Sequence, residues 1–224
     1  MIEAKDVSLK YPDGTLALNN VNISINKGEL VYITGPSGSG KTSFLKLIMG
    51  IEYPTSGSLR VLGQNIEQKE ESQIRKMRRS IGPVFQEFRL IKGRTALENV
   101  IDGLRIIGFS PRRLKEEAEL ALDKVGLKHK AKSLVENLSW GEAQRVSIAR
   151  AVARKPSLIL ADEPTENLDY ENAVKILDLL ASFRNENTAV VITTHATHLI
   201  EGFKDATFLR VASGIITKDG GERL

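Results

Sequence analysis

The stretch LVYITGPSGSGKT, from Leu30 to Thr42, decides the fold. Its first part is short and almost entirely apolar, which is typical of a strand buried on both faces of a parallel sheet. Its second part matches the pattern G-x-x-x-x-G-K-[ST], in which glycines let backbone N–H groups converge on phosphate oxygens. Apolar residues at helical spacing follow and stop near Gly50. This order of strand, loop and helix predicts a nucleotide-binding P-loop.

The residue types of this loop suit the phosphates of a nucleoside triphosphate. We expect Lys41 to reach the β- and γ-phosphates, and we expect the Thr42 hydroxyl to hold Mg²⁺. The predicted nucleotide site comprises the whole loop: Gly35, Pro36, Ser37, Gly38, Ser39, Gly40, Lys41 and Thr42.

A second apolar run, SLILAD from Ser157 to Asp162, ends in adjacent carboxylates. Two charges at the end of a buried strand cost free energy unless they bind a cation or accept a proton in a reaction. Asp162 fits a ligand role toward Mg²⁺, and Glu163 fits a general base that polarises water. The sequence therefore predicts metal binding at Asp162 and catalysis at Glu163.

Strands and helices alternate along most of the chain. Residues 1–28 alternate apolar and polar side chains around a Pro12–Gly14 turn, which predicts a small antiparallel sheet. Further strands are expected at 157–162 and 189–194, with a helix at 171–183 between them. The pattern predicts an α/β fold of the P-loop NTPase kind: a parallel core sheet, an N-terminal antiparallel part and a helical insert.

We expect one domain over residues 1–224, with a core of 1–86 and 154–224 and a helical subdomain of 87–153. Within the insert, Ser110 is expected as an N-cap with Pro111 as the first helical residue. Gly126 is expected to end that helix.

Composition narrows the class of protein. The net charge is +4, from 32 basic and 28 acidic residues, which is too mild an excess to indicate specific nucleic-acid binding. There are 0 cysteines, so neither disulfides nor thiol chemistry operate. The N-terminus does not resemble a secretory signal, and no apolar run approaches the about 18 residues of a membrane span. We therefore expect a cytoplasmic protein or one attached to a partner.

The order of motifs is similar to that of the ATP-binding subunits of ABC transporters. After the P-loop come VFQ at 84–86, LSWGEAQR at 138–145, LILADEPT at 158–165, ENLD at 166–169 and TTH at 193–195. The element LS-x-GE-x-QR separates this family from other P-loop proteins. The segment 84–100 resembles its cell-division branch; the lipoprotein-release (LolD) and macrolide-efflux (MacB) ATPases, or another ABC importer or exporter ATPase, are the alternatives.

The resemblance implies a role for each matching residue. Tyr11 corresponds to the aromatic residue that stacks on adenine, and Gln86 to the residue that touches Mg²⁺ and the attacking water. His195 corresponds to a histidine that contacts the γ-phosphate. The signature loop, which caps the γ-phosphate of the opposite subunit, corresponds to Ser139, Gly141 and Glu142. The loop that crosses the dimer interface corresponds to the segment that contains Asp169.

The resemblance also implies partners and ligands. ATP and Mg²⁺ are expected between two copies arranged head to tail around a two-fold axis. An integral membrane subunit, FtsX-like if the cell-division branch is right, is expected to dock near Gln86–Arg94. Attachment through that subunit would place the chain on the cytoplasmic face of the membrane.

Other classes fit less well. A DNA-acting ABC protein needs long coiled-coil insertions, and a ribosome-acting factor normally carries two such domains. A P-loop kinase lacks the LSWGE element. A catalytically dead binding module conflicts with Glu163 and His195.

Two positions depart from the family pattern: Trp140 stands where glycine is usual, and Glu166 stands where near relatives carry glycine. Trp140 either crowds the incoming nucleotide or packs on the second copy. Because a phosphate pocket has no room for an indole, we expect the ring to point outward, toward the second copy or the sugar of the nucleotide.

Overall fold

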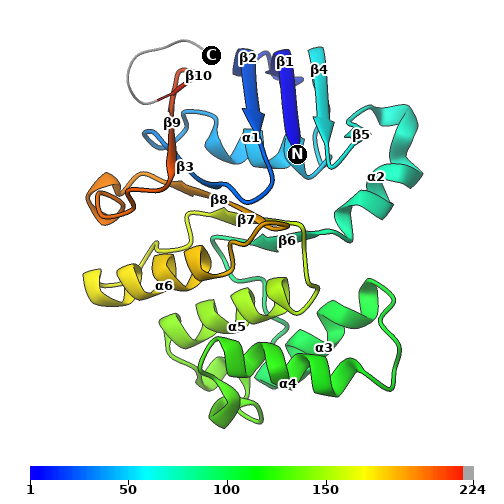
Figure 1. Cartoon of the computed structure of the whole chain (residues 1–224), viewed down its shortest axis with the longest axis vertical. Helices are drawn as coiled ribbons and strands as arrows, with labels where there is room; N and C mark the ends of the chain where they lie inside the picture. The colour runs from blue at the N-terminus through cyan, green and yellow to red at the C-terminus, as the bar shows by residue number, and fades with distance from the viewer. Residues whose placement is uncertain (219–224) are drawn as a thin grey trace. The chain divides into compact units, whose positions relative to one another are not determined.

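The computed structural model describes residues 1–218 (Figure 1). The contacts between residues group the chain into two compact units. Among the described residues, the first unit comprises residues 1–78 and 184–218, and the second unit comprises residues 79–183. The second unit extends beyond the 87–153 insert expected from the sequence, because the strands β6 (Ile81–Val84) and β7 (Leu158–Asp162) belong to it.

The first unit contains the predicted antiparallel sheet. Its strand order is β2-β1-β4-β5. In β1, buried side chains recur with a period of two on either side of an irregularity at Lys5–Asp6, as a half-covered sheet requires. The strands are β1 (Ile2–Lys10), β2 (Leu16–Ile25), β4 (Ser56–Val61) and β5 (Gln64–Asn65).

The same unit contains a second sheet built on β3 (Leu30–Thr34), whose five residues are all buried. β3 pairs in parallel with β8 (Ala189–Thr194) on one side and β9 (Thr207–Ala212) on the other. β10 (Ile215–Lys218) adds an antiparallel edge to β9. The remaining elements of this unit are α1 (Lys41–Ile48), α2 (Glu71–Arg78) and the short helices η1 (Gln68–Glu70) and η4 (Thr197–Leu199).

The second unit combines a parallel strand pair with a group of helices. β6 pairs in parallel with β7; the sequence analysis predicted the second of these strands but not β6. α5 is buried on most of its surface and packs against α3, α4, α6 and β6. The helices are α3 (Ala96–Ile106), α4 (Leu114–Lys124), α5 (Trp140–Val152), α6 (Tyr170–Ser182), η2 (Lys128–Lys130) and η3 (Val135–Asn137).

One helix boundary differs from the sequence prediction. α4 begins at Leu114 rather than Pro111, and Arg113 is its N-cap residue. The Arg113 N–H donates to the Ser110 carbonyl at 2.9 Å, so Ser110 and Pro111 open a separate turn before the helix. The predicted end is confirmed: Gly126 follows the helix with a φ of 72°.

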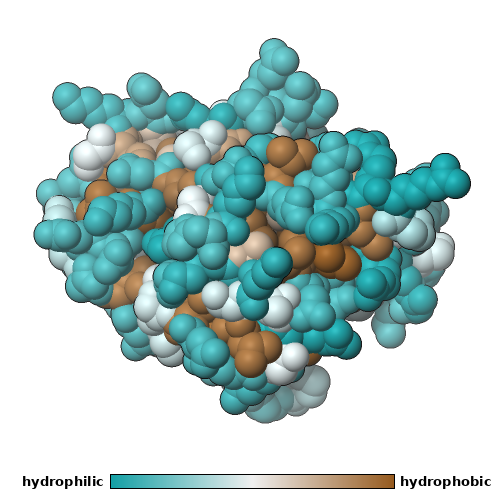
Figure 2. Space-filling model, turned by 90° about the horizontal axis from the view of Figure 1, so that it is seen from below, coloured by the Kyte–Doolittle hydropathy of each residue, from teal (hydrophilic) through white to brown (hydrophobic). Residues whose placement is uncertain are grey.

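Hydrophobic side chains reach the surface at several places. Figure 2 shows them as separate brown patches between teal hydrophilic residues on one face. Ile106 is 81% exposed and Trp140 is 46% exposed. In the described part of the chain, no helix has both the length and the apolar content to cross a bilayer.

Candidate functional site

In the first unit, the P-loop connects β3 to α1 along a path that only glycine permits. Gly35 has a φ of 151°, and a Cβ there would lie 2.2 Å from the Val211 carbonyl oxygen. Gly40 has a φ of 114°, and its Cβ would lie 2.5 Å from the Ala17 carbonyl oxygen. Side chains at either position would collide with backbone that cannot yield easily. The loop therefore needs glycine at both ends.

The interior of this loop is chemically suited to phosphate. Lys41 is buried, and its Nζ donates to the carbonyl oxygens of Gly35 at 2.8 Å and Pro36 at 3.0 Å. No side chain caps the N-terminus of α1, where backbone N–H groups and the helix dipole favour anions. The Ser39 hydroxyl is buried and has no hydrogen-bond partner among the described residues. A cation, a helix N-terminus and a spare hydroxyl together fit a phosphate chain.

Tyr11 and His195 also lie in the first unit. The Tyr11 hydroxyl is 3.1 Å from the Ser43 hydroxyl, which places the ring against the first turn of α1. His195 is exposed and directly follows β8. Since Thr34 of β3 pairs with Thr194 of β8, the P-loop and His195 leave the same edge of one sheet. Ligands of α/β proteins bind at this carboxyl edge.

The second unit places its predicted site residues at an equivalent edge. Val84 of β6 pairs with Ala161 of β7, so Asp162 ends β7 while Gln86 and Glu163 follow the two neighbouring strands. Glu163 has a φ of 44°, in the left-handed region. Such a conformation costs about 1–3 kcal/mol in a residue other than glycine and is concentrated at functional sites.

The predicted magnesium ligands are few and chemically appropriate. Mg²⁺ usually keeps several waters and takes one or two carboxylates together with substrate phosphates. The hydroxyl of Thr42, the amide oxygen of Gln86 and the carboxylate of Asp162 are all oxygen donors of the required kind. Within residues 1–218, no group of three or more His, Cys, Asp or Glu side chains could hold a metal by itself.

The signature segment caps a helix. Ser139 is the N-cap of α5, and its hydroxyl accepts a hydrogen bond from the Glu142 N–H at 3.2 Å. The Glu142 carboxylate accepts in return from the Ser139 N–H at 2.8 Å. This N–H lowers the pKa of Glu142, and Lys130, 3.4 Å away, lowers it further. Ser139 and Glu142 therefore stabilise the helix start within the chain.

Gly141 lies in the first turn of the same helix. A Cβ at this position would lie 3.8 Å from a Leu168 methyl group, which is ordinary van der Waals contact. Unlike Gly35 and Gly40, Gly141 has space for a side chain within its own chain.

Asp169 is the N-cap of α6. Its carboxylate accepts a hydrogen bond from the Asn172 N–H at 2.9 Å, and this bond lowers the pKa of Asp169. Its position at a helix start fits both a cap and an exposed loop residue.

Comparison with known proteins identifies the family. The profile described as ABC transporter matches residues 18–166. The chain belongs to the ABC transporter family. The cell division ATP-binding protein FtsE of Bacillus subtilis (strain 168) is 41% identical over 219 residues, covering 98% of this chain and 96% of that protein. FtsE of Escherichia coli (strain K12) is 42% identical over 200 residues, covering 89% and 90%.

Solved structures agree with the ABC assignment. The ATP-binding cassette MJ0796, in a dimeric post-hydrolysis state bound to ADP and Pi, superposes with a TM-score of 0.85 at 35% identity, covering 97% of this chain and 98% of that one. CbiO1 from Clostridium perfringens, part of the transporter complex cbiONQ, gives a TM-score of 0.85 at 26% identity, covering 96% and 86%. The expected ABC ATPase fold is therefore confirmed.

The indole of this ABC protein has contacts that the sequence did not predict. The Trp140 ring does leave the signature loop, but it packs on its own chain: its centroid lies 4.6 Å from that of Phe88 at an interplanar angle of 64°. Its Nε1 donates to the Glu166 carbonyl oxygen at 3.1 Å. The contacts cross 26 and 52 positions of sequence, so periodicity could not reveal them.

The sequence analysis also missed two residues that hold the 86–94 segment in place. Asn99 on α3 is buried and exchanges hydrogen bonds with the backbone of Ile91, at 2.7 and 3.2 Å. Arg150 on α5 donates to the carbonyl oxygens of Phe88 and Arg89, both at 2.6 Å. A polar residue inside an apolar helix face is the signal that could have found Asn99. His129 and His198 are exposed.

Proposed function

We propose that this ABC protein is the ATP-hydrolysing subunit of a cell-division complex, in which two copies drive an FtsX-like membrane partner. The observation that carries the proposal is the similarity to FtsE, which extends over 98% of the chain and not only over the P-loop. The carboxylate-ended strand and the signature helix add the chemistry that such a subunit needs.

We assign the phosphates of ATP to the P-loop, with the Lys41 ammonium and the N-terminus of α1 as the positive charges that hold them. Mg²⁺ supplies charge neutralisation at these phosphates, and the oxygen donors Thr42, Gln86 and Asp162 suit it. Glu163 orients the attacking water and accepts its proton. His195 contributes a donor to the terminal phosphate, and Tyr11 offers a ring face to adenine.

We assign the signature helix to the ATP of a second copy. The N-terminus of α5 carries an exposed Ser139 and a Gly141 that its own chain does not crowd. A glycine without a steric reason inside the chain suits the close approach of a phosphate from outside. A head-to-tail pair then has two equivalent sites.

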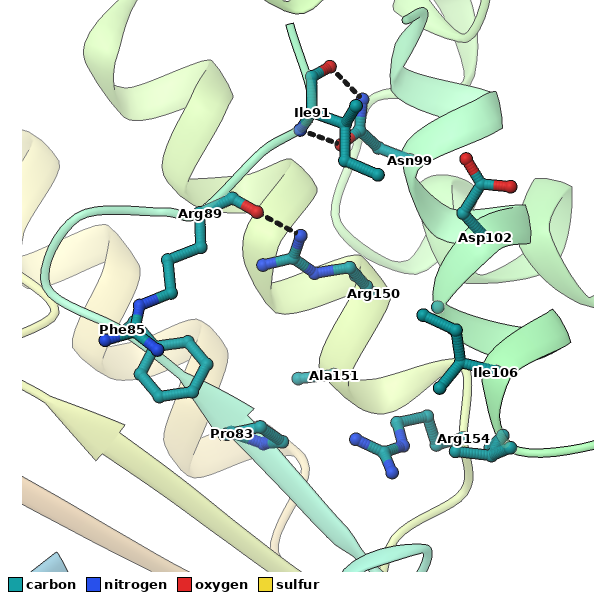
Figure 3. Close-up of a pocket in the computed structure, with 12 residues that line it drawn as sticks. Pro83, Phe85, Arg89, Ile91, Asn99, Asp102, Ile106, Arg150, Ala151 and Arg154 are labelled. Atoms are coloured by element: carbon teal, nitrogen blue, oxygen red, sulfur yellow. Dashed lines mark hydrogen bonds between the residues drawn. The ribbon is translucent and has the colours of Figure 1, made fainter. Parts of the chain in front are cut away.

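The membrane partner is assigned to a cavity in the second unit, lined by the segment after β6 and by α3 and α5. This docking cavity has a volume of about 250 Å³ and includes Phe85, Ile91 and Ile106 (Figure 3). Ile106 is 81% exposed and Ile91 is 47% exposed at its margin. An apolar helix face of the partner would cover them.

The same cavity is positively charged. Arg89, Arg150 and Arg154 line it (Figure 3), whereas the Asp102 carboxylate, 2.6 Å from Arg105, is already neutralised. Burial lowers the pKa of Arg150, and the Arg154 and Arg89 cations lower it further. Cations gathered in a partly desolvated cavity favour an anion, so we expect an acidic side chain on the docking helix. Docking there would hold the chain on the cytoplasmic face of the membrane.

The test of this function is Glu163→Gln in the full chain. The isosteric amide keeps the packing but cannot accept the proton, so ATP binding persists while turnover falls by at least about 100-fold. The variant should accumulate as an ATP-bound dimer in size-exclusion chromatography. Glu201→Gln, an exposed carboxylate elsewhere in the first unit, is the matched control and keeps full activity. Native turnover in Glu163→Gln would refute the assignment.

A further inference from the structure

The two residues that depart from the family pattern touch each other in the fold. Trp140 is the first residue of α5 in the signature segment, and Glu166 lies in the turn after β7. The Trp140 Nε1–H donates to the Glu166 carbonyl oxygen at 3.1 Å. Because this hydrogen bond joins Trp140 to Glu166, we consider the two residues together.

The Glu166 side chain continues the contact to Gln86. Its carboxylate accepts a hydrogen bond from the Gln86 Nε2. The turn that carries Glu166 is closed by its own N–H, which donates to the Glu163 carbonyl at 3.2 Å. Glycine at position 166 would have no side chain for this bond. The orientation of the Gln86 amide therefore depends on Glu166 in this chain.

The indole is anchored on its other side by Phe88. The two ring centroids are 4.6 Å apart in an edge-to-face arrangement, which is a favourable geometry for aromatic pairs. The Phe88 carbonyl in turn accepts from Arg150 at 2.6 Å and from Ser147 at 3.4 Å. Trp140 therefore contacts both the segment after β6, through Phe88, and the turn after β7, through Glu166. The hydrogen bonds from Arg150 and Ser147 hold the first of these segments against α5.

We propose that Glu166 is a positioning residue for Gln86 and that Trp140 fixes Glu166; we call this set the Gln86–Glu166–Trp140 latch. A carboxylate accepts hydrogen bonds and cannot donate them, so it selects the Nε2 end of the amide. The Oε1 end is then turned away from Glu166 and is presented to other groups. Oxygen is the atom with which an amide ligates Mg²⁺ or accepts from water.

The latch rests on the proposed ATPase function, in which Gln86 contacts Mg²⁺ and the attacking water. Without Glu166, the Gln86 amide can rotate and present either end, so only part of the molecules are ready to react. Groups that orient a metal ligand from behind typically change metal affinity or activity about 10–100-fold. The P-loop residues that bind the phosphates are not members of the latch, so we expect nucleotide affinity to be independent of Glu166.

The kinetic test compares Glu166→Ala with Glu166→Gln. Glu166→Ala should lower kcat about ten-fold and raise the Mg²⁺ concentration needed for half-maximal rate, with the Kd for ATP unchanged. Glu166→Gln should restore most of the rate, because its own amide oxygen still accepts from Gln86. Glu171→Ala, an exposed glutamate at the start of α6, is the control. An unchanged or faster Glu166→Ala enzyme would overturn the proposal.

A second readout needs no turnover. In the nucleotide-free chain, the side-chain NH₂ resonances of Gln86, assigned by their loss in Gln86→Met, should shift in Glu166→Ala and stay in Glu171→Ala. The single Trp gives one indole N–H resonance, which should exchange slowly with solvent. Unshifted Gln86 resonances would overturn the proposal that Glu166 positions Gln86, but they would not contradict the proposed ATPase function. Shifted resonances in a chain without ATPase activity would instead refute the proposed function.

Discussion

Gly141 differs from the P-loop glycines in what surrounds it. A Cβ on Gly35 or Gly40 would lie within 2.5 Å of a backbone oxygen, whereas a Cβ on Gly141 would meet nothing closer than 3.8 Å. The first two are needed for the fold of one chain. Gly141 is needed only if something from outside, such as the phosphate of a second copy, approaches the N-terminus of α5.

This difference predicts opposite effects on stability and on assembly. Gly141→Ala should leave the free energy of unfolding equal or raise it by up to about 1 kcal/mol, because alanine favours a helix. The same methyl should weaken ATP-dependent dimerisation in the Glu163→Gln background. Denaturant unfolding and size-exclusion chromatography measure the two quantities. Gly202→Ala, with nothing within 4 Å of its Cβ, should change neither. Normal dimerisation of Gly141→Ala would argue against the role of this helix end.

Trp140 marks the limit of what single residues reveal in a sequence. The pattern identified it as unusual, and sterics predicted that the ring leaves the loop, which the structure confirms. The sequence could not show that the ring packs on Phe88 and donates a hydrogen bond to Glu166, because both residues lie far from Trp140 along the chain. Such contacts depend on how β6 and β7 pair, which only the fold supplies.

At the scale of elements, apolar periodicity predicted the central strands β3, β7 and β8 and the helices α1, α4 and α6, but gave no strand for β6, β9 or β10. β3, β7 and β8 lie where continuous apolar runs placed them. Helix starts were predicted less well from local polar residues. Ser110 and Pro111 were expected to begin a helix, but they form a turn, and α4 starts at Leu114. The buried Glu117 pairs with Arg113 four residues earlier and with Lys155 at 2.8 Å, and only the first partner stands at a spacing that the sequence shows.

Helix α3 carries the prediction about the membrane partner. Ile106→Glu places a carboxylate on the margin of the docking cavity and should abolish co-purification with an FtsX-like subunit expressed alongside. Because Ile106 is 81% exposed, the chain should fold and bind ATP as before. Leu120→Glu on α4 is the matched control, since Leu120 is 50% exposed and lies outside the cavity. Retention of Ile106→Glu by the membrane subunit would remove this surface as the docking site.

At the scale of the molecule, each unit carries a different part of the chemistry. The first unit holds the P-loop, Tyr11 and His195, and the second holds Gln86, Asp162, Glu163 and the signature helix. The sequence prediction grouped Gln86, Asp162 and Glu163 with the P-loop in a core of 1–86 and 154–224. Strand pairing instead gives them to the second unit, because β6 and β7 pair with each other and α5 packs on β6. In the head-to-tail pair proposed above, each ATP would be shared between the P-loop of one copy and the signature helix of the other.

Sharing of this kind predicts that two inactive variants rescue each other. Lys41→Ala removes the phosphate-binding cation, and Gly141→Asp adds a negative charge where the second copy's phosphates approach. The Asp side chain has room, and an acidic residue suits a helix N-terminus, so the variant should fold. In a mixed pair, both changes fall on one site, and the other site is intact. An equal mixture should therefore regain roughly a quarter of the native ATPase rate, since about half of random pairs are mixed and each has one working site of two. If each copy instead completed its own site, every site in the mixture would carry one defect, and mixing would restore nothing.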